Sequence, residues 1–517
     1  MGFVLATVEK PMAFPSRSHM VPVAALGMLV AGIAQAAETP VQRLQLGNRI
    51  SWGIDSRTLQ RVSTVGVDRY LDEQLRPDPA APLPPAIQAQ IDAMQISRTP
   101  MPQLVRQLEA QRKAMDPIHD EQQKKALQDA YQKALNAPMR EAATRSLLRD
   151  LYSPKQLQEQ MTWFWMNHFS VFSYKANIRP MLADYEDAVR AHALGRFRDL
   201  LGAVAHHPAM LRDLDNDQNA AGHINENYAR ELMELHTLGV NGGYSQKDVQ
   251  EVARVLTGLG VNQGDAMPKI KPALQAQYRR AGLFEFNPGR HDYGPKVVLG
   301  APIRSSGLAE TDEVLDRLAR QPATAHFISR KLAIYFIGDG VSDALVERLA
   351  QAYLHSDGQI AVVLKQLFRS DEFHASLGRD FKDPIHYVVS AVRLAYEDKP
   401  ILNAGPMLGW LGRMGEPLYG RQTPDGYPLG QAAWVSSGQM NTRFEIAKAI
   451  GSGSAGLFKL DQPNATDAPA FPQLQNALYY QAWQPALSAP TRDALTQARS
   501  PQEWNTYFLA SPDFMNR

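Results

Sequence analysis

The segment from Asn225 to Gly260 restricts the fold of this chain more than any other stretch. Its first part, N-E-N-Y-A-R-E-L-M-E-L-H-T-L-G, has apolar residues at the three- and four-residue spacing of an amphipathic α-helix. Gly239 and an N-G-G turn follow, and S-Q-K-D (245–248) has the form of a capping box for a second helix. The pattern predicts a helical hairpin.

A helical wheel, drawn at about 100° per residue, divides the first helix into two faces. His236 falls on the apolar face with Tyr228 and Leu232, about 140° away from Glu231. The sequence E-L-M-E-L-H is therefore not the zinc-peptidase motif, in which two histidines four residues apart share one face. The polar face holds Glu226, Asn227, Arg230, Glu231, Glu234 and Thr237.

This polar face has two interpretations. Glu226, Arg230 and Glu234 are spaced four residues apart, so an exposed ladder of ion pairs explains them, at about 0.3–0.5 kcal/mol per pair. Alternatively, the charged groups form the floor of a cleft. Two carboxylates in different environments can then act as general acid and base, or bind a hard cation. The sequence leaves both interpretations open.

Two other segments carry side chains capable of chemistry. His168 lies in a strongly apolar run and is either a core histidine with one hydrogen bond or a ligand or general base. Candidate strands at 284–286 and 296–299 flank a turn-rich segment that contains His291 and Asp292 and leads to Lys296. Alternatively, Asp292 makes only a local backbone hydrogen bond in a solvated turn.

The N-terminal residues have the features of a signal peptide. An apolar run of about 14 residues, 21–34, is shorter than the roughly 20 residues that span a bilayer. The small-x-small pattern at 34–36 predicts cleavage near Ala36/Ala37, and hence a periplasmic or secreted protein. We expect no stable membrane span.

Composition excludes several classes of site and partner. The chain contains no cysteine, so disulfides and thiolate metal sites are excluded. Its formal charge is +1, from 54 basic and 53 acidic residues. Such a balance provides no field of a single sign, and we therefore expect no nucleic-acid partner.

Helical periodicity predominates along the rest of the chain. We predict a mainly α, bundle-like single large domain with many helices, a small β-hairpin element and a helical N-terminal arm. The predicted organisation is a signal peptide (1–36), an N-terminal helical segment with a proline-rich connector (37–85), a helical arm (86–151), a main helical domain with a motif-bearing core (152–450) and a loosely packed C-terminal region (451–517).

Several long motifs resemble those of the bacterial domain-of-unknown-function family 1800. They are F-W-M-N-H-F (164–169), N-E-N-Y-A-R-E-L-M-E-L-H-T-L-G (225–239), A-R-V-L-T-G (253–258), H-D-Y-G-P-K (291–296) and P-D-G-Y-P...W (424–434), with N-R-I-S-W-G and L-D-E-Q-L-R-P near the N-terminus. The resemblance covers nearly the whole mature chain. It implies an exported bacterial protein, often encoded beside a protein similar to the sulfatase and alkaline-phosphatase superfamily. Position 236 is often aromatic in this family, which agrees with a packing role for His236.

The resemblance also favours one constellation of functional residues. Its members are His168, Glu226, Asn227, Arg230, Glu231, Glu234, His291, Asp292 and Lys296. We expect an exported enzyme, a hydrolase or a metal-dependent enzyme, that acts on an envelope or extracellular substrate. Glu226 or Glu231 is then the acid or base, Lys296 and Arg230 stabilise an anion, and His168 and His291 carry protons or bind a divalent metal.

The alternative is a non-catalytic scaffold. It would bind the sulfatase/phosphatase-like exported protein or an envelope polymer, and the same residues would form an internal hydrogen-bonded network. An open pocket where the constellation converges favours the enzyme, whereas a filled, dry junction favours the scaffold.

Overall fold

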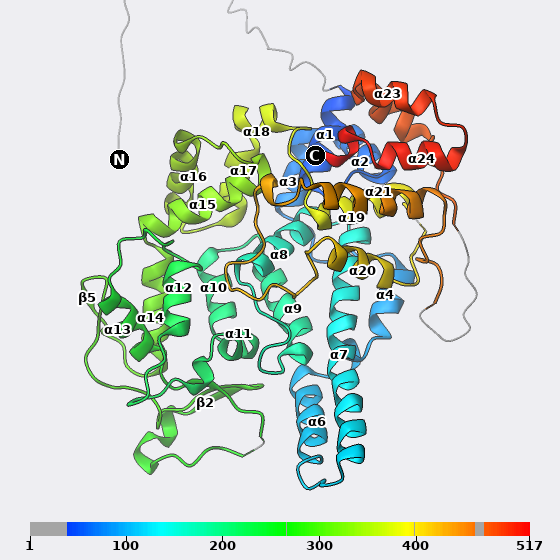
Figure 1. Cartoon of the computed structure of the whole chain (residues 1–517). Coiled ribbons are helices and arrows are strands. Elements are labelled where there is room, and N and C mark those ends of the chain that lie inside the picture. The colour runs from blue at the N-terminus through cyan, green and yellow to red at the C-terminus, as the bar shows by residue number, and fades with distance from the viewer. Residues whose placement is uncertain (1–38, 265, 398, 461–469) are drawn as a thin grey trace, which may run out of the picture. The chain divides into compact units, whose positions relative to one another are not determined.

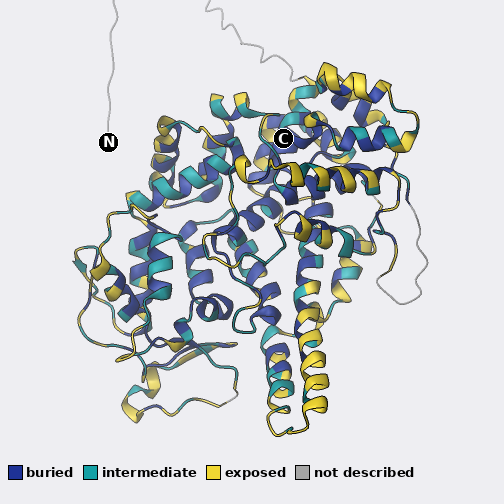
Figure 2. Ribbon diagram, viewed as in Figure 1, coloured by how far each residue is buried: buried dark blue, intermediate teal, exposed yellow. Residues whose placement is uncertain are grey.

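Two helices that are buried on nearly every side lie in the core of the fold. α8 (Gln156–His168) carries the aromatic run W-F-W, and most of its residues are buried. Every residue of α19 (Pro384–Tyr396) is buried. Because neither helix has a fully polar face, other elements surround both of them, as the dark blue ribbons in Figure 2 show.

The computed structural model describes residues 39–517 except 265, 398 and 461–469. The signal peptide expected at 1–36 lies outside these residues. The described chain is mainly α-helical, as predicted, and Thr39–Arg517 forms one compact unit (Figure 1). Among the residues described, no helix is both long and apolar enough to cross a membrane.

The other helices surround this core along the chain. They are α1 (Pro40–Ile50), α2 (Ser56–Val65), α3 (Val67–Leu75), α4 (Pro85–Asp92), α5 (Gln95–Arg98), α6 (Met101–Lys113), α7 (Glu121–Tyr152), α9 (Leu182–His192), α10 (Phe197–Ala205), α11 (Pro208–Asp213), α12 (Asn227–Glu234), α13 (Gln246–Val255), α14 (Leu308–Ala319), α15 (Pro322–Ile337), α16 (Asp343–His355), α17 (Ile360–Phe368), α18 (Asp371–Ser376), α20 (Gly405–Arg413), α21 (Ser437–Gly451), α22 (Gln484–Ala486), α23 (Ala489–Thr496), α24 (Pro501–Leu509) and α25 (Pro512–Met515). Short 3-10 helices are η1 (Arg179–Met181), η2 (Asn216–Gln218), η3 (Pro272–Gln277) and η4 (Gln431–Ala433), and η5 (Tyr479–Trp483) is a π-helix.

The helical arm of the N-terminal part is a hairpin of α6 and α7 (Figure 1). A small apolar cluster, separate from the main core, holds its two helices together. This cluster consists of Leu104, Leu108, Tyr131 and Leu135. Toward its C-terminal end α7 enters the main core, where Leu147 and Leu148 are buried. The last turns of α7 can therefore present side chains to α8 and α9.

The small β element consists of two separate sheets. β1 (Leu259–Val261), β3 (Phe284–Phe286) and β2 (Arg279–Ala281) form an antiparallel sheet in the order β1-β3-β2. β4 (Val297–Val298) pairs with β5 (Ala301–Pro302). The two candidate strands of the sequence are therefore strands, but each pairs within its own sheet rather than with the other.

The predicted helical hairpin forms from α12 and α13. Gly239 has a positive φ of 81°, as expected after a helix, and Ser245 and Asp248 form the capping box of α13. The first helix is shorter than predicted, because it ends at Glu234. Wider turns follow, in which the His236 N–H donates to Glu231 O (3.0 Å).

The C-terminal region, which we expected to be loosely packed, contributes to the core in its described residues. Phe508 of α24 and Phe514 of α25 are buried, and α24 packs on α21. Arg517 is also buried, and its Nε donates to Asp380 (2.9 Å).

Candidate functional site

His168, the last residue of α8, is fully engaged by its neighbours. Its Nε2 lies 3.1 Å from the backbone oxygen of His236, and its Nδ1 lies 2.9 Å from Nζ of Lys331 in α15. Because a carbonyl only accepts, Nε2 carries the proton and Nδ1 accepts from the lysine. Burial lowers the pKa of His168 well below its ordinary value, and burial lowers the pKa of Lys331 to about 8.

His236 lies on the core side of the chain, as the helical wheel predicts. Its ring is fully buried and contacts Phe169 (5.0 Å between centroids) and Tyr228. Neither ring nitrogen finds a hydrogen-bond partner among the described residues. Burial lowers the pKa of His236 to about 3, so the ring is a neutral packing group.

The polar face of α12 is a set of partly exposed pairs. Arg230 Nη2 lies 3.1 Å from Glu226 Oε2, and Gln246 of α13 also donates to this oxygen (2.7 Å). Glu234 instead accepts from the Tyr244 hydroxyl (3.3 Å). The ion-pair interpretation therefore describes the first pair of the ladder, but not the second.

Glu231 and Asn227 occupy different surroundings on this helix. Burial and the neighbouring carboxylates of Glu234 and Asp425 raise the pKa of Glu231. Asp425 belongs to the P-D-G-Y-P segment, so this segment approaches the helix. The Asn227 side chain donates to Leu214 O (3.2 Å), which ties α12 to the end of α11.

The H-D-Y-G-P-K segment forms a closed network around a residue that the sequence did not reveal, Glu310 of α14. His291 Nε2 and Lys296 Nζ contact its two oxygens at 3.1 and 2.6 Å. The other ring nitrogen of His291 donates to Thr257 O (2.7 Å). Burial raises the pKa of Glu310, but the hydrogen bonds from His291 and Lys296 outweigh it and lower the pKa. The one sequence signal for Glu310 was its position three residues after Gly307, at a helix start.

Asp292 completes this network from the other side. Arg254 of α13 contacts both of its oxygens, at 2.9 and 3.1 Å. These bonds lower the pKa of Asp292 to about 2. The Gly294 N–H donates to the same carboxylate (2.8 Å), so Asp292 makes the local bond of a turn as well as an ion pair.

The structure thus divides the expected constellation into three groups. His168 pairs with Lys331, the α12 carboxylates face Gln246, Tyr244 and Asp425, and His291, Asp292 and Lys296 bind Glu310 and Arg254. Within the described part of the chain, no hydrogen bond or ion pair joins the third group to the other two. The same residues contain no group of three or more His, Asp or Glu arranged to hold a metal ion.

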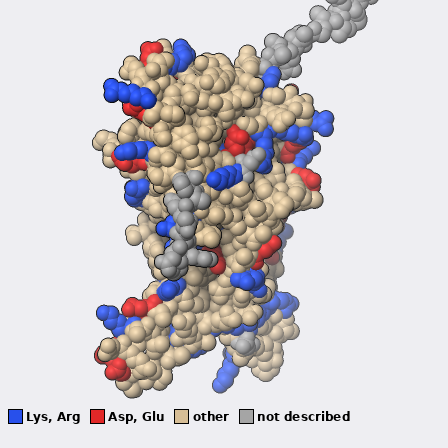
Figure 3. Space-filling model, turned by 90° about the vertical axis from the view of Figure 1, so that its right-hand side faces the viewer, with Lys and Arg blue, Asp and Glu red and all other residues tan. Residues whose placement is uncertain are grey.

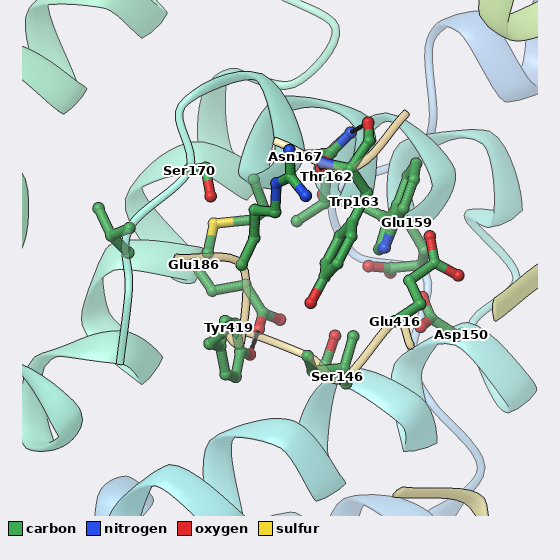
Figure 4. A pocket seen from close by; sticks show the side chains of 15 residues that line it. Ser146, Asp150, Glu159, Thr162, Trp163, Asn167, Ser170, Glu186, Glu416 and Tyr419 are labelled. Carbon is green, nitrogen blue, oxygen red and sulfur yellow. Dashed lines mark hydrogen bonds between the residues drawn. The ribbon is translucent and has the colours of Figure 1, made fainter. Parts of the chain in front are cut away.

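A cavity lined by buried carboxyl groups lies between α7, α8, α9 and the loop after α20. Its volume is about 40 Å³, which is room for a few water molecules. The carboxyl groups come from Asp150, Glu159, Glu186 and Glu416, none of which is more than 3% exposed. Figure 4 shows them around a common space, which we call the acidic pocket.

Two of these carboxyl groups have an unsatisfied oxygen. Asp150 Oδ2 and Glu416 Oε1 are buried and have no hydrogen-bond donor among the described residues. Burial, with the nearby carboxyls of Glu159 and Glu186, raises the pKa of Asp150 well above its ordinary value. Burial and Asp383 raise the pKa of Glu416 in the same way. Burial therefore favours the protonated, neutral form of both groups.

The other two carboxyl groups have partners that stabilise charge. Arg190 of α9 binds both oxygens of Glu159, and the contact from its Nε is 2.8 Å long. The Tyr419 hydroxyl donates to Glu186 (Figure 4), and Arg149 lies 3.7 Å from it. Nevertheless, burial raises the pKa of Glu186. The pocket thus combines proton donors with a carboxylate held by an arginine.

The loop that covers the acidic pocket is fixed by Asn167. The Asn167 side chain donates to Tyr427 O (3.0 Å) and accepts from Tyr427 N (2.6 Å). Gly426, with φ of 77°, lies so close that an added Cβ would be 2.1 Å from Asn167 O. Two of the motifs, F-W-M-N-H-F and P-D-G-Y-P, therefore meet at this pocket.

Residues 45–516 match the family described as Protein of unknown function (DUF1800). The chain belongs to this family. No curated protein and no solved structure matches it. In this DUF1800 protein, the motif at 164–169 holds the loop over the acidic pocket, and the motif at 291–296 builds the closed network with Glu310. On the face shown in Figure 3, basic and acidic side chains are interspersed on a largely uncharged surface.

Only one member of the acidic pocket could be suspected from the sequence. Glu159 is an acidic residue inside α8, the helix that carries the strongly apolar run ending at His168. Burial of such a residue requires a partner or a function. Asp150, Glu186 and Glu416 carry no comparable signal, because they join the pocket only through tertiary packing.

Proposed function

We propose that this chain is an exported enzyme that uses general acid–base catalysis in the acidic pocket, on an envelope or extracellular substrate. One observation carries the proposal. Asp150 and Glu416 each place an unsatisfied, buried carboxyl oxygen in one cavity with Glu159, which Arg190 holds by two contacts. Buried polar groups without partners are costly in a purely structural role, so a ligand explains them better.

The roles follow from the surroundings of each group. Asp150 and Glu416, kept protonated by burial, donate a proton to a leaving group. Glu159, which Arg190 holds by two contacts, accepts a proton from water or stabilises positive charge. A buried carboxylic acid beside a carboxylate that is paired with an arginine can act as the acid and the base of a hydrolase.

The expected constellation enters this proposal in a supporting role. His168 lies at the end of α8, one residue after Asn167, and contacts Lys331 of α15, while Asp425 approaches Glu231 from the covering loop. These contacts position the loop over the pocket. Catalytic roles for Glu226, Glu231, Glu234 and Arg230 remain a second proposal, tested by the same assay.

Export is proposed from the N-terminal sequence. The apolar run and the small-x-small pattern before Ala37 support a cleaved signal peptide and a periplasmic or secreted protein. Mass spectrometry of the N-terminus of the mature protein tests this proposal, because an intact Met1 in the exported fraction contradicts it.

The closed network around Glu310 favours a second candidate, the non-catalytic scaffold. His291 and Lys296 are bound to Glu310, and Asp292 is bound to Arg254. Few of their hydrogen-bonding groups are therefore available to a substrate. In this candidate the protein binds the sulfatase/phosphatase-like exported protein or an envelope polymer. Co-purification with that protein, without activity in the assay below, would support the scaffold.

A divalent metal is proposed only as an accessory. To bind one, His168 or His291 would exchange a hydrogen bond to Lys331 or Glu310 for a metal bond. Elemental analysis of the purified protein tests this idea, since a stoichiometric metal supports it and a metal content near zero contradicts it.

The acid–base proposal is tested by an activity screen. Purified protein is incubated with fluorogenic esters, amides, glycosides and phosphoesters, and any activity is compared with that of Asp150→Asn and Glu416→Gln. We expect a loss of about 10²–10⁴-fold in kcat for Asp150→Asn. The matched control is Asp129→Asn, an exposed aspartate on the same helix. Full activity in both pocket variants contradicts the proposal.

A further inference from the structure

The acidic pocket contains more carboxyl groups than basic side chains that pair with them. Arg190 donates to Glu159. The Tyr419 hydroxyl donates to Glu186, and Arg149 lies near the same carboxyl. Asp150 and Glu416 still have one unsatisfied oxygen each. Arg421 at the pocket contributes little positive charge, because its Nη2 contacts both oxygens of Asp425, at 2.9 and 3.0 Å, and this pairing neutralises it. The pocket therefore suits a ligand group with several N–H donors and a positive charge.

The walls of the pocket between these carboxyls are aromatic. Trp163, Tyr419 and Tyr427 line it together with the four acids. Aromatic faces attract cations through the ring quadrupole, and aromatic rings combined with carboxylates are a recurrent environment for ammonium groups. A volume of about 40 Å³ admits a head group of a few atoms, but not a sugar ring.

A larger groove adjoins the acidic pocket. Its volume is about 720 Å³, within the usual range for small-molecule sites. Leu418 lines both the pocket and the groove, so the two are neighbours. The groove has apolar and aromatic walls from Met139, Phe172, Tyr174 and Leu408. Arg140 and a few uncharged polar residues also line it, and no carboxylate does among the described residues.

The groove is kept open by glycines of α20. Gly405 and Gly409 are one helical turn apart and both line it. A Cβ on Gly409 would meet no atom within 4 Å. Glycine inside a helix costs about 1 kcal/mol relative to alanine, so its presence here needs a reason other than helix stability. Space for a ligand is such a reason.

We propose that this chain binds an amphiphilic amine, whose ammonium group enters the acidic pocket and whose uncharged part lies in the neighbouring groove. The inference rests on the proposed function and names the substrate class of the same site. No covalent bond forms between the amine and the protein. The ammonium group displaces the proton of one of the two carboxyls, Asp150 or Glu416; this O–H bond breaks and the proton leaves to the solvent, while the other carboxyl keeps its proton as the acid of the proposed function.

The charged groups around the two carboxyls determine this exchange. Asp150 faces Glu159 from α8, Glu186 from α9, Arg149 from its own helix and the indole of Trp52. Around Glu416 lie Asp383, Arg443 and Arg517. Two carboxyls, Glu159 and Glu186, lie near Asp150 against one arginine, Arg149. An ammonium group is therefore stabilised beside Asp150 once the carboxyl proton of Asp150 has left.

The test measures binding of n-alkylamines from methylamine to octylamine to the full chain by calorimetry. We expect affinity to rise with chain length, by up to about fourfold for each methylene that becomes buried. We also expect proton release, detected as a dependence of the binding enthalpy on the ionisation heat of the buffer. Octanol, which has the same tail without the charge, should bind at least tenfold more weakly than octylamine.

Variants separate the pocket from the groove. Asp150→Asn and Glu416→Gln should weaken every amine at least tenfold, whereas Asp129→Asn should not. Gly409→Trp fills the groove and should remove the dependence on chain length without changing methylamine affinity. The matched control is Gly412→Trp on the same helix, because Gly412 also has no atom within 4 Å of its Cβ and does not line the groove.

Three results would overturn the inference. They are equal affinity for octanol and octylamine, tight binding of Ca²⁺ or of a neutral oligosaccharide in place of amines, and equal effects of the two tryptophan variants. The outcome is independent of catalysis. Activity that depends on Asp150 without amine binding would contradict this inference and leave the proposed acid–base function intact. Amine binding without any activity would contradict the proposed enzymatic function and leave the binding inference intact.

Discussion

Asn167 and Tyr427 pair through both hydrogen-bonding groups of the asparagine side chain, at 3.0 and 2.6 Å. This pair joins the end of α8 to the loop over the acidic pocket. Asn167 is itself 8% exposed, so water cannot easily replace its bonds.

We therefore expect Asn167→Ala to destabilise the protein by about 1–3 kcal/mol, because it leaves the Tyr427 N–H and carbonyl without their partner. Urea unfolding measures this loss. Hydrogen exchange should accelerate selectively at 419–430, while the arm of α6 and α7 keeps its protection. Unchanged exchange in the loop would show that other contacts hold it.

Gly426 allows the same loop to approach α8. Its φ is +77°, and an added Cβ would lie 2.1 Å from Asn167 O. Gly243 in the turn before α13 has the same φ of +77°, but a Cβ added there would meet no atom within 4 Å. The two positions therefore share a positive φ and differ in the crowding that a Cβ would meet.

We expect Gly243→Ala to cost about 1–2 kcal/mol, the penalty of an L-residue in this region, and Gly426→Ala to cost at least about 2 kcal/mol more. Thermal and urea unfolding of the two variants give the difference. Equal losses would mean that the loop moves away at little cost, and that its close approach to α8 is not needed for stability.

Glu310 binds two buried side chains, His291 and Lys296, so its removal should destabilise the protein. Its contacts with Lys296 Nζ (2.6 Å) and His291 Nε2 (3.1 Å) lie in the protein interior. Glu310→Ala should cost about 3–5 kcal/mol, because it leaves the Lys296 charge buried and unpaired. The control is Glu226→Ala, whose pair with Arg230 is partly exposed and should contribute about 0.2–1 kcal/mol.

The double variant Glu310→Leu with Lys296→Met distinguishes charge from packing. We expect it to recover much of the stability lost in Glu310→Ala, since no unpaired charge remains. If the double variant is less stable than Glu310→Ala, the hydrogen bonds to His291 and Asp292 O, rather than the charge, determine the stability of this network.

The sequence predicted local features well. Periodicity and capping residues placed α12, Gly239 and the Ser245 cap, and the wheel placed His236 toward the core, because these depend on neighbours within a few residues. The constellation was harder to place. His168 and His291 are far apart in sequence, and only packing shows that each is occupied by a different partner, Lys331 or Glu310.

The acidic pocket lay beyond sequence reasoning for the same physical cause. The packing of α7 against the loop after α20 brings Asp150 and Glu416 to one cavity. No periodic pattern in the sequence predicts this tertiary contact. Burial, which raises their pKa values, is likewise a tertiary property. A charged residue inside a mostly apolar, mostly buried helix, as with Glu159, is the one signal that sequence can supply.

His236 should contribute to the pH dependence of the free energy of unfolding, and its contribution can be measured separately from that of other groups. Its ring makes no hydrogen bond with the described residues and packs among aromatic side chains, so phenylalanine can replace it. Burial lowers its pKa from 6.5 to about 3. The unfolded chain therefore binds a proton below about pH 6.5 that the folded chain does not, and wild-type stability falls as pH falls toward 3.

His236→Phe removes this loss. The variant should be about as stable as the wild type at pH 7.5, and its advantage should grow by about 1.4 kcal/mol per pH unit between pH 6 and 4. Urea unfolding of both proteins at each pH measures the difference, in which the contributions of Asp150, Glu416 and His168 cancel. The exposed His119, changed to Phe, is the control, because solvent surrounds its ring before and after unfolding. A constant difference across this range would show that the folded protein admits a charged His236.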